Sequence, residues 1–307
     1  VDAVRQMHFP ESFESLEKAR RRIVFDEFLI FQLRLLRRIE KLRHKYKAHA
    51  FQISDDAHKA FRQSLPFTLT PDQDKTLAEV ASDLSQPVPM NRLLQGEVGS
   101  GKTLVAAFAL YLSVQNNFQA ALLVPTELLA EQHYRTLTQI LKPFQISAGL
   151  VTSSTPQDRK DKLFAQLGRG ELKAIVGTHA LLQEKIEFKS LALVVIDEQH
   201  KFGVYQRNHL MQRVPRPHQL VMTATPIPRT LALTLYGDLR VSTLKTMPKG
   251  RKPIKTYWIT RAKQSLVLKR VIEKVAAGEQ GYIIFPLIEE TEKSDLLAAK
   301  QEFEKLK

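Results

Sequence analysis

The most constraining feature of this sequence is the glycine-rich segment 96–103, which reads GEVGSGKT. It fits the phosphate-binding pattern G-x-x-x-x-G-K-[ST] at every defined position. The apolar pair Leu93 and Leu94 precedes it, and the apolar run 104–110 follows it, as in a buried strand and a buried helix. This order of strand, loop and helix favours an α/β fold with a nucleoside triphosphate site. The alternative is a glycine-rich turn that only caps a helix.

The positions of this segment predict the parts of a nucleotide site. Glycines let the backbone pass close to the phosphates, and N–H groups at the start of the helix point at the anion. We expect the Lys102 ammonium to reach the β- and γ-phosphates as a catalytic group, and the Thr103 hydroxyl to bind Mg²⁺. The residues expected to bind the nucleotide here are Gly96, Gly99, Ser100, Gly101, Lys102 and Thr103.

Two carboxylates follow a second apolar run. Residues 193–196 (LVVI) are typical of a parallel strand buried on both faces, and Asp197 and Glu198 come next. In an open parallel sheet, the carboxyl end of a central strand faces the crevice where ligands bind. We therefore expect Asp197 to hold Mg²⁺ and Glu198 to polarise the attacking water, rather than to form a solvated acidic pair.

Composition limits the class of protein. The chain has 307 residues, enough for two domains, and it contains no cysteine. The lack of thiols and of a secretory signal predicts a cytoplasmic protein, and no apolar run is long enough to span a membrane. The formal net charge of +14 favours a polyanionic partner, with nucleic acid as the first candidate.

The first of three predicted segments, residues 1–64, is a basic helical region. Residues 12–47 combine an apolar stripe at helical spacing with many arginines and lysines. This basic face has two interpretations that the sequence leaves open: a surface beside DNA, or an ordinary solvated helix face.

The second segment, residues 65–246, alternates strands and helices, which indicates a mostly parallel sheet with helices on both faces. Helices are expected at 127–142 and 155–167, among others. Strands are expected at 92–95, 120–124, 147–151, 174–176, 193–196, 219–222 and 240–244.

The third segment, residues 247–307, begins with a linker rich in proline and basic residues at 247–253. A strand at 255–259, a helix at 264–277 and a strand at 281–285 are expected to follow, with Trp258 in the core. Two strands cannot bury an α/β core, and the chain starts with Val1. The sequence therefore predicts a fragment whose second α/β lobe is incomplete.

Several segments, in order along nearly the whole chain, resemble the RecG family of branch-migrating DNA helicases in superfamily two. They are 8–10 (HFP), 19–22 (ARRR), 67–73 (FTLTPDQ), 89–103 (PMNRLLQGEVGSGKT), 124–127 (VPTE), 177–179 (GTH), 197–204 (DEQHKFGV), 223–230 (TATPIPRT) and 286–290 (PLIEE). The resemblance implies a RecA-like fold whose ATP site lies between two lobes. Glu97 stands where the family usually has Asp. Lys201 stands where it usually has Arg, and a lysine cannot make a two-pronged contact.

The resemblance also implies roles for residues outside the phosphate loop. Gln73 looks like the residue that pairs with adenine, although it could be a surface residue at a helix start. Pro125, Thr126, Thr178 and His179 lie in motifs that contact a DNA strand. Without the resemblance, Thr126 and Thr178 would be read as helix caps. The residues implied to couple the nucleotide to DNA are His200, Thr223 and Thr225, and capping by Thr225 is the alternative.

The activity implied is ATP- and Mg²⁺-dependent remodelling of stalled replication forks and branch migration of Holliday junctions, by a protein more typical of a monomer than an oligomer. In this family an arginine needed for hydrolysis lies in the second lobe, beyond Lys307. The chain itself is therefore expected to bind ATP but to hydrolyse it slowly. Two other functions stay open: the motor of a transcription-repair coupling translocase, and a DNA- and ATP-binding fragment without catalysis.

Overall fold

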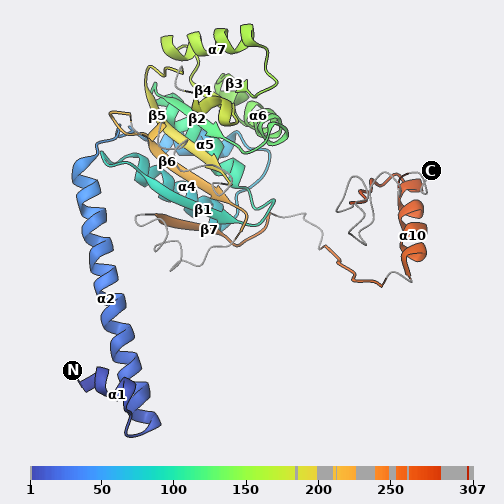
Figure 1. The fold of residues 1–307 in the computed structure, drawn as a ribbon. Coiled ribbons are helices and arrows are strands. Elements are labelled where there is room, and N and C mark those ends of the chain that lie inside the picture. The colour runs from blue at the N-terminus through green and yellow to red at the C-terminus, as the bar shows by residue number, and fades with distance from the viewer. Residues whose placement is uncertain are drawn as a thin grey trace. The chain divides into compact units, whose positions relative to one another are not determined.

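The computed structural model describes residues 2–183, 186–198, 210–211, 213–225, 239–248, 254–260, 263–284 and 303. The chain divides into two compact units, Val1–Arg251 and Lys252–Lys307. The first contains a seven-stranded sheet in which each described pairing is parallel, in the order β3-β4-β2-β5-β6-β1-β7 (Figure 1). The predicted α/β class with a RecA-like parallel sheet is confirmed.

The seven strands expected between residues 65 and 246 are present, with small differences at their ends. Helices connect most of them, as the alternation of patterns predicted. The strands are β1 (Asn91–Gly96), β2 (Gln119–Leu123), β3 (Ala148–Val151), β4 (Ala174–Gly177), β5 (Leu191–Asp197), β6 (His218–Thr223) and β7 (Arg240–Leu244). The helices of this region are α4 (Pro71–Leu84), α5 (Lys102–Gln115), α6 (Glu127–Leu141) and α7 (Gln157–Arg169), with short 3-10 turns η1 (Lys142–Phe144) and η2 (His179–Leu182).

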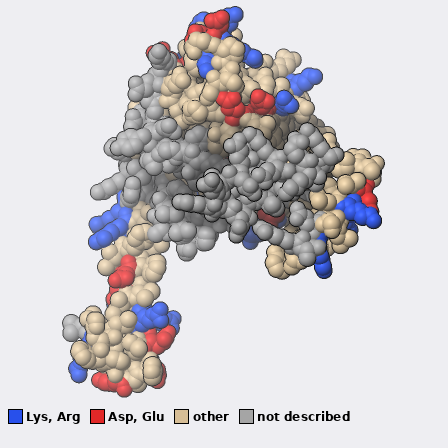
Figure 2. All heavy atoms as spheres, turned by 45° about the vertical axis from the view of Figure 1, so that its right-hand side comes forward, with Lys and Arg blue, Asp and Glu red and all other residues tan. Residues whose placement is uncertain are grey.

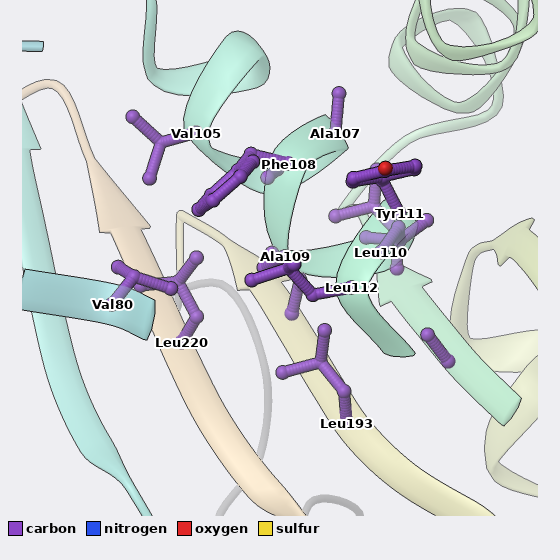
Figure 3. Close-up of a cluster of buried hydrophobic side chains, with 14 of the residues drawn as sticks. Val80, Val105, Ala107, Phe108, Ala109, Leu110, Tyr111, Leu112, Leu193 and Leu220 are labelled. Carbon is purple, nitrogen blue, oxygen red and sulfur yellow. The ribbon is translucent and has the colours of Figure 1, made fainter. Parts of the chain in front are cut away.

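The core lies on both faces of the sheet because side chains alternate along each strand. On β2, Ala120 and Leu122 belong to one buried cluster, and Ala121 and Leu123 belong to another. The run that follows the phosphate loop forms α5, and its residues 104–113 are all buried. Figure 3 shows side chains of α5 beside Val80, Leu193 and Leu220, which come from α4, β5 and β6. This packing anchors the start of α5 against the middle of the sheet.

The basic helical segment contains α1 (Asp2–His8) and α2 (Phe13–Lys45), which contact each other. Many apolar side chains of α2, such as Phe25, Phe28 and Leu36, are exposed rather than packed in a core. Residues after α2 behave differently. Phe51 and, in α3 (Asp55–Gln63), Phe61 are buried in the core of the α/β sheet, where Phe61 meets Phe108 edge to face.

In the second unit, α10 (Gln264–Ala276) confirms the helix expected at 264–277. The strand expected at 255–259 is wrong, and so is the strand expected at 281–285 over its described residues 281–284, since both stretches lack strand structure. Strands form only where a neighbour accepts their hydrogen bonds, and neither stretch pairs with another described strand. Trp258, expected in the core, is 91% exposed. Among the described residues, no helix has the length and apolar character needed to cross a membrane.

Candidate nucleotide-binding site

Three neighbouring strands bring the predicted site together. β6 pairs with both β5 and β1, and all three run parallel, so their carboxyl ends share one edge of the sheet. Gly96 ends β1, Asp197 ends β5 and Thr223 ends β6. The phosphate loop and both predicted carboxylates therefore meet at the edge where such sheets bind ligands.

The phosphate loop has the backbone shape that its glycines permit. Gly99 and Gly101 have φ angles of 83° and 98°, in the left-handed region. A Cβ on Gly101 would also come within 2.3 Å of Gln73 Nε2. Gly101 is the N-cap residue of α5 and has no side chain, so no side-chain oxygen caps the N–H groups of the first turn. The helix N-terminus is thereby left open to an anion.

Lys102 folds back over this loop. Its Nζ donates to the carbonyl oxygens of Gly96 at 2.7 Å and Glu97 at 3.1 Å. Burial lowers the pKa of Lys102, while the negative charges of Asp197 and Glu198 act in the opposite direction. Lys102 is therefore close enough to both carboxylates for their charges to act on it.

The two carboxylates are held by different partners. Asp197 is 8% exposed, and its Oδ2 lies 3.0 Å from Nε2 of His133 on α6. Glu198 has a φ of 49°, which is uncommon for a residue with a side chain. Its Oε1 accepts from the Ala224 N–H at 2.8 Å and its Oε2 from the Thr223 hydroxyl at 3.3 Å.

The segment after β6 thus contacts the predicted catalytic carboxylate directly. The hydroxyls of Thr223 and Thr225 lie 2.9 Å apart, and the Thr225 N–H donates to Thr223 Oγ1 at 3.2 Å. These contacts join Glu198 to the motif that the resemblance assigns to coupling. His200, the third residue of that prediction, lies outside the described residues.

Gln73 is buried and uses both ends of its amide within the protein. Its Oε1 accepts from the Thr70 N–H at 2.9 Å, which completes a capping box at the start of α4. Its Nε2 donates to the Ser100 carbonyl oxygen at 2.8 Å. Ser100 is fully buried, and its hydroxyl has no hydrogen-bond partner among the described residues. Gln73 is thus a brace between the α4 cap and the phosphate loop.

A pocket of about 630 Å³ adjoins this brace. Its lining runs through residues 65–71 and includes Arg62 and Asp74, which pair at 2.6 Å. Phe67 contributes an aromatic ring that is about half exposed. An aromatic face beside polar groups is a surface on which a flat heterocycle can stack.

The residues expected to touch DNA follow the carboxyl ends of β2 and β4. Thr126 is exposed and caps α6 by accepting from the Leu129 N–H at 3.3 Å, so the capping interpretation is correct for this residue. The neighbouring Pro125 is half-buried. His179 is exposed, whereas Thr178 is 1% exposed and its hydroxyl has no partner among the described residues.

Sequence reasoning missed the polar run 152–155 (TSST) at this edge. Ser153 Oγ lies 3.3 Å from His179 Nε2, and the Ser154 N–H donates to the Glu127 carboxylate at 3.0 Å. The run of hydroxyl side chains directly after the predicted strand 147–151 was the available signal. His133 was also missed, and its spacing from Asp197 carries no signal, because the two are joined only by the fold.

On the face drawn in Figure 2, the distribution of charge does not mark a surface for DNA. There the described lysines and arginines are interspersed with acidic side chains rather than gathered in one patch. The assignment therefore rests on the loops at the sheet edge and not on the net charge of +14.

Known proteins resemble this chain over most of its length. Residues 70–234 match the family model described as DEAD/DEAH box helicase. ATP-dependent DNA helicase RecG of Synechocystis sp. is 48% identical over 300 residues, which cover 98% of this chain and 36% of the relative. The RecG of Bacillus subtilis is 47% identical over 294 residues, which cover 96% of this chain and 43% of the relative. A solved structure of RecG bound to a three-way DNA junction matches with a TM-score of 0.79 and 42% identity, over 94% of this chain and 38% of that one. The chain thus spans less than half the length of these relatives.

Proposed function

The chain belongs to the DEAD/DEAH box helicase family, and from this premise we propose that it is the ATP-binding motor segment of a RecG-type DNA helicase. The resemblance to RecG that the motifs predicted is confirmed by relatives at 47% and 48% identity. One observation carries the proposal for this chain. Lys102, at the start of α5, lies with Asp197 and Glu198 at the edge of the sheet where the parallel strands β1, β5 and β6 end.

The phosphates would bind the loop backbone and the start of α5. Lys102 would exchange its bonds to the Gly96 and Glu97 carbonyls for phosphate oxygens. Mg²⁺ would be held by Thr103 and Asp197, which are oxygen donors of the kind it prefers. Two protein oxygen ligands suit Mg²⁺, which takes its other ligands from phosphates and water and would supply charge stabilisation at the phosphates.

Glu198 is the proposed base that orients the attacking water. Its carboxylate is fixed by Ala224 and Thr223, so its position depends on the segment that follows β6. A change in that segment would move the base, which is a direct physical route for the proposed coupling role of Thr223 and Thr225. For His200, the proposed coupling role rests only on the resemblance to the RecG family.

The pocket beside Phe67 is the proposed site of the adenine base. Adenine has an N6 amine that can donate to a Gln73 oxygen and an N7 that can accept from its nitrogen. Gln73 would then give up its present bonds to Thr70 and Ser100. Binding of the base would therefore break the hydrogen bond by which Gln73 holds the Ser100 carbonyl of the phosphate loop.

DNA is the proposed partner, and the contact surface is the sheet edge that carries Pro125, Thr126, Thr178 and His179, with Ser153 and Ser154. Loops of this kind grip phosphates without reading sequence. For the longer protein of which such a motor is part, we propose fork remodelling and Holliday junction migration. Support comes from the relatives named RecG and from the solved RecG complex with a three-way junction.

The test is ATP hydrolysis by the 307-residue chain without DNA, with linear duplex and with forked DNA, using Lys102→Ala as the blank. We expect measurable ATP binding but turnover near the blank, because an arginine in the second lobe of such motors contributes ~10³–10⁵-fold in rate. Strong turnover that rises with forked DNA would contradict the slow-hydrolysis part of the proposal. Equal ATP binding by the wild type and Lys102→Ala would contradict the nucleotide site itself.

A further inference from the structure

We propose that His133 is a positioning residue of the nucleotide site, which holds the Asp197 carboxylate in the orientation that a metal ion requires. The inference rests on the proposed function, since it assigns His133 a part in the same site. His133 lies within α6, 64 residues before Asp197 in the sequence, and its Nε2 is 3.0 Å from Asp197 Oδ2. The side chains of both residues are 11% exposed, so little water competes for this contact.

The chemistry of the two groups shows which atom carries the hydrogen in the contact between His133 and Asp197. An ionised carboxylate only accepts hydrogen bonds, so His133 Nε2 must carry the hydrogen. The other ring nitrogen, Nδ1, is buried and has no partner among the described residues. The pair is therefore an oriented hydrogen bond in which His133 Nε2 donates to Asp197 Oδ2.

This bond restrains a side chain that would otherwise rotate. A carboxylate at the end of a strand can turn about its terminal torsion, which has a broad minimum. Once Oδ2 is engaged by His133, the orientation of the whole group is set. Groups that hydrogen-bond a metal-binding carboxylate orient it, and losing one typically weakens metal binding about 10–100-fold. Helix α6 gives His133 a firm base, because Ala130, Leu137 and Leu141 are buried in the core.

The discriminating experiment measures Mn²⁺ binding to the ADP complex of the 307-residue chain by electron paramagnetic resonance, beside ADP binding in EDTA. His133→Leu removes the donor, and His133→Gln keeps an N–H donor at similar reach. His58→Leu is the matched control, because it removes a half-buried imidazole that packs on Phe108 and not on Asp197. Thermal unfolding checks that each variant folds.

We expect His133→Leu to weaken Mn²⁺ binding about tenfold and to leave ADP affinity in EDTA unchanged. His133→Gln should recover most of the loss, and His58→Leu should match the wild type. Wild-type Mn²⁺ affinity in His133→Leu would overturn the inference. It would also be overturned if the leucine and glutamine variants lost Mn²⁺ affinity, and ADP affinity in EDTA, to the same extent. If His133→Leu fails to fold, His133→Asn replaces it, since its shorter amide cannot reach Asp197. Failure of the wild type to bind ADP at all would instead overturn the proposed function.

Discussion

Gln73 Nε2 donates a hydrogen bond to the carbonyl oxygen of Ser100, 27 residues away and inside the phosphate loop. The same amide completes the capping box of α4 through Thr70. A residue that the resemblance assigns to the base is therefore already a structural part of the phosphate site. This double use predicts that changes at Gln73 affect both stability and nucleotide choice.

Gln73→Ala should lower the free energy of unfolding by about 1 kcal/mol, because the capping box loses its returning bond. It should also weaken ATP binding more than GTP binding, because only adenine offers the N6 amine and N7 pair. Competition binding with both nucleotides and urea unfolding measure the two effects. Equal losses for ATP and GTP would mean that Gln73 braces the loop without reading the base.

Gly101→Ala should abolish nucleotide binding and destabilise the chain by about 1–3 kcal/mol. The residue has a φ of 98°, and its Cβ would meet Gln73 Nε2 at 2.3 Å. Gly168→Ala is the matched control, because a Cβ there meets nothing within 4 Å and lies in helix α7. The control should be neutral or stabilising by up to about 1 kcal/mol. Calorimetry and ADP titration distinguish the two variants, and similar behaviour of both would contradict this account of the loop.

A buried charge cluster predicts a large loss at Arg92. This side chain bonds Asp83 at 2.8 Å, Glu79 at 2.9 Å and Ser242 at 2.6 Å, and so joins α4, β1 and β7. Arg92→Met should cost about 3–5 kcal/mol, because it removes a buried partner of the buried Asp83 carboxylate.

Arg240→Met is the comparison, because Arg240 also contacts Asp83 but is half-exposed. We expect it to cost less than about 1 kcal/mol. Both variants are compared by chemical denaturation. Equal losses of stability would show that burial does not make Arg92 contribute more than Arg240.

Acid should destabilise the chain through His218. Its Nδ1 accepts from the Met90 N–H at 2.9 Å, and its Nε2 donates to the His49 carbonyl oxygen at 2.7 Å, which requires a neutral ring. Burial lowers the pKa of His218 to about 4, below the ordinary value of 6.5. Because the folded pKa is lowered, the stability is fully present above pH 6.5 and is lost as the pH falls towards 4.

The total loss in the free energy of unfolding from protonation of His218 is on the order of 3 kcal/mol. Urea unfolding of the wild type and His218→Gln between pH 7 and pH 4.5 isolates it, since His49 and His58 titrate in both proteins. The wild type should lose more stability than the variant over this range. Parallel curves would show that the pKa of His218 does not differ between the folded and unfolded states.

Features that depend only on neighbouring residues could be predicted from the sequence. Loop 96–103, the apolar runs of the strands and the Asp197–Glu198 pair each depend on local spacing, so the seven strands and the helix after the loop were predicted. The strands expected at 255–259 and 281–285 failed for the opposite reason. A strand exists only when a distant segment pairs with it, and local pattern cannot supply that partner.

The site is held by contacts between segments that are distant in the sequence. The contact of His133 with Asp197 and the bonds of Glu198 to Thr223 and Ala224 join residues that no spacing rule relates. The order of strands in the sheet sets them side by side, with β2 and β6 on either side of β5. Chemistry at such a site needs particular residue types, which the sequence displays. Orientation of those residues needs neighbours from other strands and helices, which only the folded chain provides.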